Sequence, residues 1–212
     1  MQYVGMPHSW ADYYCEGFEA IIRKCKCHIS REVVEKSIHM LRDFNPRIHY
    51  REVEYPAEDI FAKIIQFWHV DIPIQSFMET FWSGLQLKAE IFPDTVDVLR
   101  KLRERGYGIA ALTDLPSAMP DEMFKRDISE LMGYFDYYVS SSVSGYRKPN
   151  DRGLQMISER FATPIEELIF VGDEEKDRKT ALRANCKFIW IHRGEKREEG
   201  IENLYELLEV LE

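Results

Sequence analysis

The sequence predicts an α/β fold: a parallel sheet with helices on both faces, preceded by a helical domain. After residue 90, short β-branched and aromatic runs alternate with helical patterns, and this alternation is typical of a parallel sheet with helices on both faces. Before residue 90, apolar residues recur at three- and four-residue steps, which is the helical period. We therefore expect two domains, 1–90 and 91–212, with no strand in the first 85 residues.

Four helical patterns fill the first domain. The first carries Trp10, Tyr14, Phe18, Ile21, Ile22 and Cys25, and the second follows Ser30, a typical N-cap residue. The third and fourth run over about 57–69 and 74–84, and Asn45-Pro46 and Tyr55-Pro56 mark turns between helices. We interpret this domain as a small helical bundle, rich in aromatic residues.

In the second domain, helical and strand patterns alternate from its start. A helix opens at Pro93-Asp94 and ends near Gly106. The remaining expected elements are a strand over 108–113, a helix over 119–132, a strand over 137–141, a helix over 151–161, strands over 168–171 and 187–192, and a closing helix over 201–211. These elements supply the parallel sheet and its covering helices.

Composition excludes several classes of protein. The net charge of −9 argues against a nucleic-acid binder, which needs a basic face. No stretch approaches the roughly 20 apolar residues of a membrane span, and no signal peptide is visible, so we expect a cytoplasmic protein that does not bind membranes. The four cysteines do not form a disulfide framework. Cys25-Lys26-Cys27-His28 begins like a metal site, but no second pair of soft ligands follows at zinc spacing.

The most informative stretch runs from Gly172 to Asp177, directly after the apolar run over 168–171. That run predicts a buried strand, so Asp173 comes at the carboxyl end of a strand, where open α/β sheets bind ligands. Asp177 follows at the start of the next helical pattern. Two acids at this place repel each other unless a cation lies between them, and Mg²⁺ with oxygen ligands is the usual one.

Two further strands end in reactive residues. Thr113-Asp114 places a hydroxyl and backbone N–H groups at one carboxyl end, and Lys148, in Lys148-Pro149, follows the next strand. Each feature alone has a simpler interpretation: Thr113 as a helix N-cap, Lys148 as a solvated surface lysine, and Asp173 as part of a strand-to-helix loop. Together, a hydroxyl, an ammonium and an acid pair at one sheet edge indicate a phosphoryl-transfer site.

The order of these motifs resembles the haloacid dehalogenase (HAD) superfamily. Thr113-Asp114, Lys148-Pro149 and Gly172-Asp173-x-x-x-Asp177 are similar to its second, third and fourth motifs. The helical region resembles the cap of its subfamily I. The resemblance implies a Rossmann-like core, a mobile cap and Mg²⁺-dependent hydrolysis of a small phosphorylated metabolite. It also implies phosphate binding by Thr113 and Asp114, catalytic support by Lys148, metal ligation by Asp173, and a role for Asp177 either in the metal shell or paired with Lys148.

The family's first motif is missing. Family members begin with a buried strand ending in Asp-x-Asp, which supplies the nucleophile and the general acid/base, and this chain contains no such motif. Asp12 does not follow a strand, and Asp43 ends a helical pattern. The absent strand would lie between those ending at Thr113 and Val171, so its loss leaves a gap of about 9.6 Å in the sheet. We expect a truncation, with residues 1–7 as a remnant of the core, and we expect the 212-residue chain to be inactive.

Three functions stay open from the sequence. The first is a Mg²⁺-dependent phosphatase that acts through an aspartyl-phosphate. The second is a non-catalytic protein of the same fold that binds a phosphorylated ligand or a partner. The third, less favoured, is a carbon–halogen dehalogenase, because dehalogenases of this fold typically lack the Gly-Asp-x-x-x-Asp pattern. The substrate and the oligomeric state are not predicted; Tyr3, His8, Trp10 and Tyr13 are candidates for substrate contact.

Overall fold

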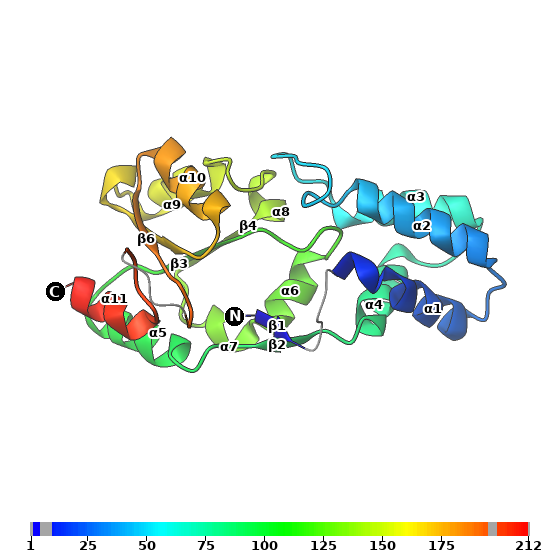
Figure 1. Ribbon diagram of the computed structural model, residues 1–212, viewed down its shortest axis with the longest axis horizontal. Coiled ribbons are helices and arrows are strands. Elements are labelled where there is room, and N and C mark those ends of the chain that lie inside the picture. Colours follow the sequence, from blue (N-terminus) through cyan, green and yellow to red (C-terminus); the bar gives the residue numbers. More distant parts are fainter. Residues whose placement is uncertain (1, 5–9, 195–198, 212) are drawn as a thin grey trace. The chain divides into compact units, whose positions relative to one another are not determined.

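A computed structural model describes residues 2–4, 10–194 and 199–211 (Figure 1). The chain forms two compact units. The helical unit comprises Met1–Arg51, Tyr55–Glu90 and Leu115–Ile128, and the α/β unit comprises Glu52–Glu54, Ile91–Asp114 and Ser129–Glu212. No helix in these described ranges has the length and apolar character that a membrane crossing requires.

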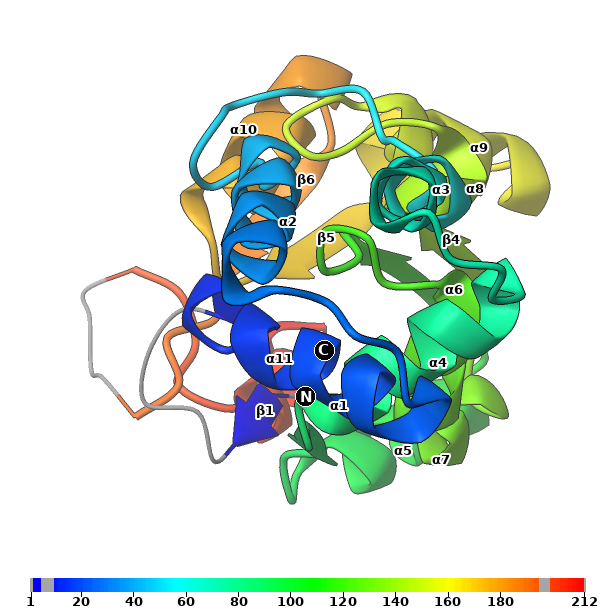
Figure 2. The same ribbon diagram turned by 90° about the vertical axis from the view of Figure 1, so that its right-hand side faces the viewer.

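The helical unit is built on four amphipathic helices, with bounds close to those expected. They are α1 (Tyr14–Cys25), α2 (Arg31–Asp43), α3 (Ala57–Trp68) and α4 (Ile74–Gly84), with a 3-10 turn at Trp10–Asp12 and the shorter α6 (Asp121–Asp127). Ser30 caps α2, since its side chain accepts from the Val33 N–H. The fully buried core of this unit combines four phenylalanines with aliphatic side chains: Phe18, Phe61, Phe77 and Phe81 pack with Ile21, Ile60, Ile64 and Met78. Helices α1 and α4 pack closely (Figure 2), and a Cβ added at Gly84 would lie 2.6 Å from the Ala20 Cβ.

A short antiparallel ribbon also belongs to the helical unit. Strand β1 (Gln2–Val4) pairs with β2 (Lys88–Glu90), with Tyr3 opposite Ala89. The expectation of no strand in the first 85 residues is therefore wrong at β1. A three-residue strand shows no readable alternation in sequence, and it forms here because the segments before and after the helices meet and exchange backbone hydrogen bonds.

The α/β unit contains the alternating elements that its sequence predicts. They are α5 (Thr95–Glu104), β3 (Ala110–Thr113), α7 (Ser129–Met132), β4 (Tyr137–Ser140), α8 (Ser141–Ser144), α9 (Arg152–Phe161), a 3-10 turn at Ile165–Glu167, β5 (Ile169–Gly172), α10 (Glu175–Ala184), β6 (Lys187–Trp190) and α11 (Leu204–Val210). The helix expected over 119–132 is divided into α6 and α7, which end and begin on either side of Ile128.

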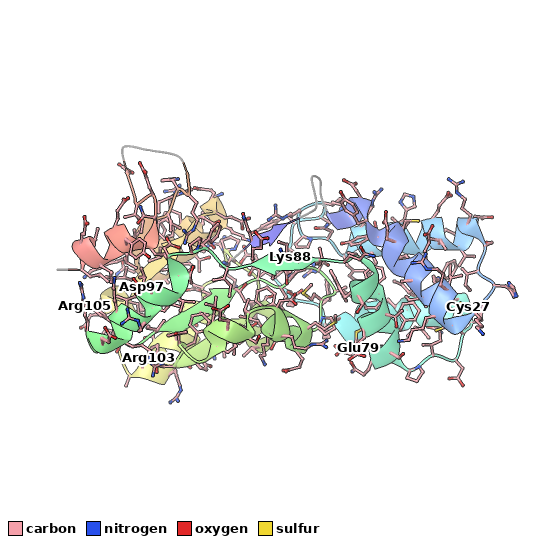
Figure 3. All side chains as sticks on the ribbon, turned by 90° about the horizontal axis from the view of Figure 1, so that it is seen from below. Cys27, Glu79, Lys88, Asp97, Arg103 and Arg105 are labelled. Atoms are coloured by element: carbon pink, nitrogen blue, oxygen red, sulfur yellow. The ribbon has the colours of Figure 1, made fainter. Side chains whose placement is uncertain are left out.

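Helices cover both faces of the strands, so the expected fold class is confirmed. On one face, α5 and α11 enclose an apolar cluster that includes Val98, Leu102, Leu207 and Leu208. On the other, α9 and α10 enclose a second cluster with Val139, Leu154 and Ala181. Figure 1 shows α9 and α10 on one side of the strands and α5 and α11 on the other. In Figure 3, Asp97 lies in the first turn of α5, whereas Arg103 lies in its last turn, which suits the helix dipole.

The strands of this unit form two separate parallel pairs. Strand β3 pairs with β4, with Thr113 opposite Ser140, and β5 pairs with β6, with Gly172 opposite Trp190. Among the described residues, β3 and β5 are not paired with each other. The continuous sheet expected from the alternation is therefore divided between β3 and β5 in the described part of the chain.

Candidate active site

The turn from β5 into α10 brings two acids of the motif to the end of a strand. Gly172 is the last residue of β5, and Asp177 lies in the first turn of α10. A Cβ at Gly172 would lie 2.5 Å from the Asp177 Cβ, so only glycine permits this approach. Glu174 is the N-cap, and it forms a reciprocal capping box with Asp177. Local sequence chemistry therefore fixes where the Asp177 carboxylate points.

Asp177 is buried, and each of its carboxylate oxygens lies close to a cation or to backbone N–H groups. Its Oδ1 lies 2.6 Å from Lys148 Nζ, and both side chains are nearly excluded from solvent. Its Oδ2 accepts from the backbone N–H groups of Asp173, at 3.2 Å, and Glu174, at 3.0 Å. Of the two roles considered for Asp177, the structure contains the pairing with Lys148.

Asp114 links the end of β3 to the loop that carries Lys148. Its Oδ1 accepts from the Lys148 backbone N–H at 3.0 Å. Burial alone would raise the pKa of Asp114, but the nearby cations of Lys148, Lys176 and Arg147 and the N–H of Lys148 outweigh it, so this pKa lies below its ordinary value. Thr113 ends β3 beside it, and the Thr113 hydroxyl lies 3.5 Å from the Asp114 carbonyl oxygen.

Lys176 is a second lysine at this site, and the sequence analysis did not single it out. Its Nζ lies 3.1 Å from Asp114 Oδ2 and 2.6 Å from Glu174 Oε2. Burial lowers the pKa of Lys176, but the Asp114 and Glu174 carboxylates raise it by more, so it is held above its ordinary value. Only the spacing was available as a signal: a lysine one residue before a motif acid, in the first turn of a helix.

A buried ion pair supports the loop before Lys148. Arg147 NH1 donates to Glu54 Oε2, and both side chains are nearly buried. The Ser141 hydroxyl donates to the same carboxylate oxygen at 2.5 Å. The backbone N–H of Glu54 donates to the Gly145 carbonyl oxygen at 2.9 Å, and that of Arg147 donates to the Glu52 carbonyl oxygen at 2.7 Å. Residues 52–54 thus join the α/β unit, which the sequence pattern did not reveal.

The acids described here do not by themselves form a Mg²⁺ site. Asp177 and Asp114 are paired with lysines, and in the described residues Asp173 is an exposed acid that enters no ion pair. No group of three or more His, Cys, Asp or Glu side chains in the described part of the chain could hold a metal ion. Mg²⁺ binds through one or two carboxylates completed by water and phosphate oxygens, and Asp173 alone offers one such ligand.

The two acids considered as substitutes for the missing motif, Asp12 and Asp43, do not follow strands in the structure. Asp12 lies in a 3-10 turn, 3.6 Å from Arg42, and Asp43 ends α2. Among the candidates for substrate contact, Tyr3 donates its hydroxyl to Asp127 Oδ2 at 2.7 Å. His8 and the side chain of Trp10 lie outside the described residues.

The arrangement therefore joins Asp114, Lys148 and Asp177 directly, with Thr113 and Asp173 as chain neighbours at the strand ends. A family model described as haloacid dehalogenase-like hydrolase matches residues 24–191. The chain belongs to the haloacid dehalogenase-like hydrolases. The resemblance inferred from the motifs is confirmed, and the matched range covers parts of both the helical and the α/β region.

Several curated relatives of this HAD chain are phosphoglycolate phosphatases. That of Aliivibrio fischeri is 26% identical over 120 residues, which cover 57% of this chain and 52% of the relative. That of Escherichia coli is 25% identical over 113 residues, which cover 53% and 44%. The chain spans about half the length of the curated relatives it matches.

Solved structures share the fold. A HAD phosphatase from Thermococcus onnurineus superposes with a TM-score of 0.61 at 21% identity, over 94% of this chain and 88% of that one. A 2-haloacid dehalogenase from Pseudomonas syringae pv. Tomato superposes with a TM-score of 0.63 at 17% identity, over 95% and 89%. At these identities, the likeness concerns the fold and does not separate a phosphatase from a dehalogenase.

Proposed function

We propose that this HAD chain carries the phosphate-binding part of a site for hydrolysis of phosphate monoesters of small metabolites. The observation that supports it is the continuous set of contacts from Asp114 through Lys148 to Asp177 at the carboxyl ends of two strands. Backbone amides, a hydroxyl and an ammonium at one place are the groups that stabilise the charge of a phosphoryl group during transfer.

Each residue has a defined part in this proposal. The Thr113 hydroxyl and the amides after β3 bind phosphate oxygens. Lys148, held by Asp177, offsets negative charge, and Asp173 contributes one carboxylate toward Mg²⁺, whose chemistry would be to neutralise phosphate oxygens. No proton transfer or attack on phosphorus is assigned to these residues, since the lysines already hold Asp114 and Asp177.

The group that this proposal lacks is the nucleophile. Attack on phosphorus needs a carboxylate held in line with the leaving oxygen, and this chain contains no Asp-x-Asp after an apolar run. In this proposal, a central strand between β3 and β5 would hold such a carboxylate. We therefore expect the 212-residue chain to hydrolyse phosphate esters no faster than background.

The test compares the 212-residue chain with a version fused at its N-terminus to an apolar strand ending in Asp-x-Asp. Release of inorganic phosphate is measured with Mg²⁺ for a panel of phosphate monoesters that includes 2-phosphoglycolate, because relatives act on it. We expect turnover only in the fusion, with loss on Lys148→Ala and on removal of Mg²⁺ by chelation. Turnover by the 212-residue chain that Asp173→Ala abolishes would show that it has another nucleophile.

One specific observation favours a non-catalytic alternative. The binding groups are present without the nucleophile, so a protein that binds a phosphorylated ligand without turnover would have this site. An inactive fusion that still binds inorganic phosphate in calorimetry supports this second function. The dehalogenase reading is less favoured, because the Gly-Asp-x-x-x-Asp motif is intact.

The proposed function also concerns the partners and the cellular location of the protein. Net charge of −9 suits a small-molecule enzyme rather than a nucleic-acid binder. We propose a cytoplasmic location with no membrane association. Fractionation of cells that express a tagged form of the protein tests this, and recovery in the membrane fraction would contradict it.

A further inference from the structure

Lys176 is placed where a lysine is intrinsically unfavourable. It lies in the first turn of α10, at the positive end of the helix dipole. Its side chain nevertheless turns to the site, and its Nζ lies between Asp114 Oδ2, at 3.1 Å, and Glu174 Oε2, at 2.6 Å. The two acids outweigh the dipole, so the ammonium is held by the acidic cluster rather than by the helix.

The charges around the Lys176 ammonium indicate its effect on the site. Asp114, Asp173, Glu174 and Asp177 bring four negative charges to the strand ends. Lys148 offsets Asp177, and Lys176 offsets Asp114 while it also contacts Glu174. Carboxylate oxygens that hold an ammonium are the same oxygens that a hard divalent cation would take as ligands. An ammonium at this place also repels any divalent ion beside it.

We propose that Lys176 acts as a tethered cation that occupies the Asp114–Glu174 acid pair and lowers the affinity of the site for divalent cations. The proposal rests on the proposed function, because it concerns the same site. It deepens that function by explaining why the described acids leave Asp173 as the open metal ligand. Removal of the ammonium takes away one positive charge and its contacts with the Asp114 and Glu174 carboxylates.

The experiment measures binding of Mn²⁺, a paramagnetic substitute for Mg²⁺, to the 212-residue chain without substrate. Free Mn²⁺ is followed by electron paramagnetic resonance at low salt. We expect Lys176→Gln and Lys176→Met to bind Mn²⁺ about tenfold more tightly than the unaltered chain, the effect of removing one positive charge about 5 Å from a divalent ion in a water-like dielectric. Lys176→Arg, which keeps the charge, should bind like the unaltered chain.

Lys179→Gln is the matched control, since it removes the same charge from an exposed residue of the same helix. It should leave Mn²⁺ affinity nearly unchanged. The proposal is overturned if both neutral variants at Lys176 bind Mn²⁺ no more tightly than the unaltered chain, or show no saturable binding. Loss of folding in both, seen by circular dichroism, would also overturn it by showing a purely structural role.

The experiments distinguish failure of this proposal from failure of the proposed function. Mn²⁺ affinity is read without turnover, so an inactive strand fusion leaves this inference intact. Conversely, an active fusion combined with unchanged Mn²⁺ affinity in Lys176→Gln would overturn only the role of Lys176.

Discussion

Lys148 Nζ lies 2.6 Å from Asp177 Oδ1, and this contact joins two strand pairs that share no backbone hydrogen bond among the described residues. Lys148 follows β4, and Asp177 follows β5. The contact between Lys176 and Asp114 crosses in the same way, from α10 to the end of β3. The groups proposed to bind phosphate therefore also hold the carboxyl edge of the α/β unit together.

Asp177→Asn tests the structural part of this pairing. It keeps the shape of the side chain but leaves the buried Lys148 ammonium without its charge partner. Breaking a buried pair in this way costs about 3 kcal/mol of unfolding free energy. Urea unfolding measures it, and Asp173→Asn, an identical change at an exposed neighbour, should cost less than about 0.5 kcal/mol. Equal losses in the two variants would show that the Lys148 contact contributes nothing.

Gly172→Ala tests the close approach of β5 to α10. The added Cβ would lie 2.5 Å from the Asp177 Cβ, so the first turn of the helix must shift. We expect a loss of about 2 kcal/mol of unfolding free energy, as for other overpacked sites. Gly133→Ala is the control, because nothing lies within 4 Å of its added Cβ. A Gly172→Ala chain as stable as the control would mean that the turn relaxes freely.

The Glu54–Arg147 pair predicts a strong coupling between distant parts of the sequence. Glu54→Ala leaves the Arg147 guanidinium buried without this partner and should cost about 3 kcal/mol. Arg147→Met in the Glu54→Ala background should recover part of that loss, which a double-mutant cycle reports as coupling of about 1–3 kcal/mol. Glu35→Ala, which breaks an exposed pair with Arg31, should cost no more than about 0.5 kcal/mol. Additive effects of the two changes would contradict the pairing.

The lowered pKa of Asp114 predicts a pH-dependent stability. A carboxyl whose folded pKa lies below its unfolded value of about 3.9 stabilises the fold above that pH, and the stabilisation is lost as pH falls through the folded pKa. Asp114→Asn should therefore be less stable than the unaltered chain at pH 7, and the difference should shrink below about pH 4. Urea unfolding over a pH series measures this. A difference that stays constant with pH would show that Asp114 titrates normally.

Much of the fold could be predicted because its signals are local. The helix expected over 74–84 coincides with α4, and the strand expected over 137–141 with β4. Helical periodicity and apolar runs are properties of neighbouring residues. Strand β1 was missed, because three residues show no period, and the division of α6 from α7 was missed for the same lack of a local signal.

The site was predictable only where chain order determines position. Thr113, Lys148 and Asp173 follow strands, so their placement at strand ends could be expected. Lys176 and Glu54 could not be found in this way, because their partners are distant in sequence. A long charged side chain can also reach several oppositely charged residues. Which acid a lysine contacts depends on tertiary packing, and no periodicity in the sequence indicates that partner.

The expected gap between the strand pairs predicts an unusual pattern of hydrogen exchange. In a parallel pair, the N–H groups of one strand point alternately to its two neighbours, so β3 and β5 each direct alternate amides away from their partners β4 and β6. Amides without a hydrogen-bond partner exchange quickly, whereas paired ones exchange only on opening. We therefore expect alternating fast and slow amides along β3 and β5, measured by NMR exchange on the 212-residue chain.

The fusion with an apolar strand should slow the exchange of the fast amides by at least about tenfold if the strand enters the gap. Uniform protection along β3 in the unfused chain would show that the two pairs already close on each other and that the gap has no room for a strand.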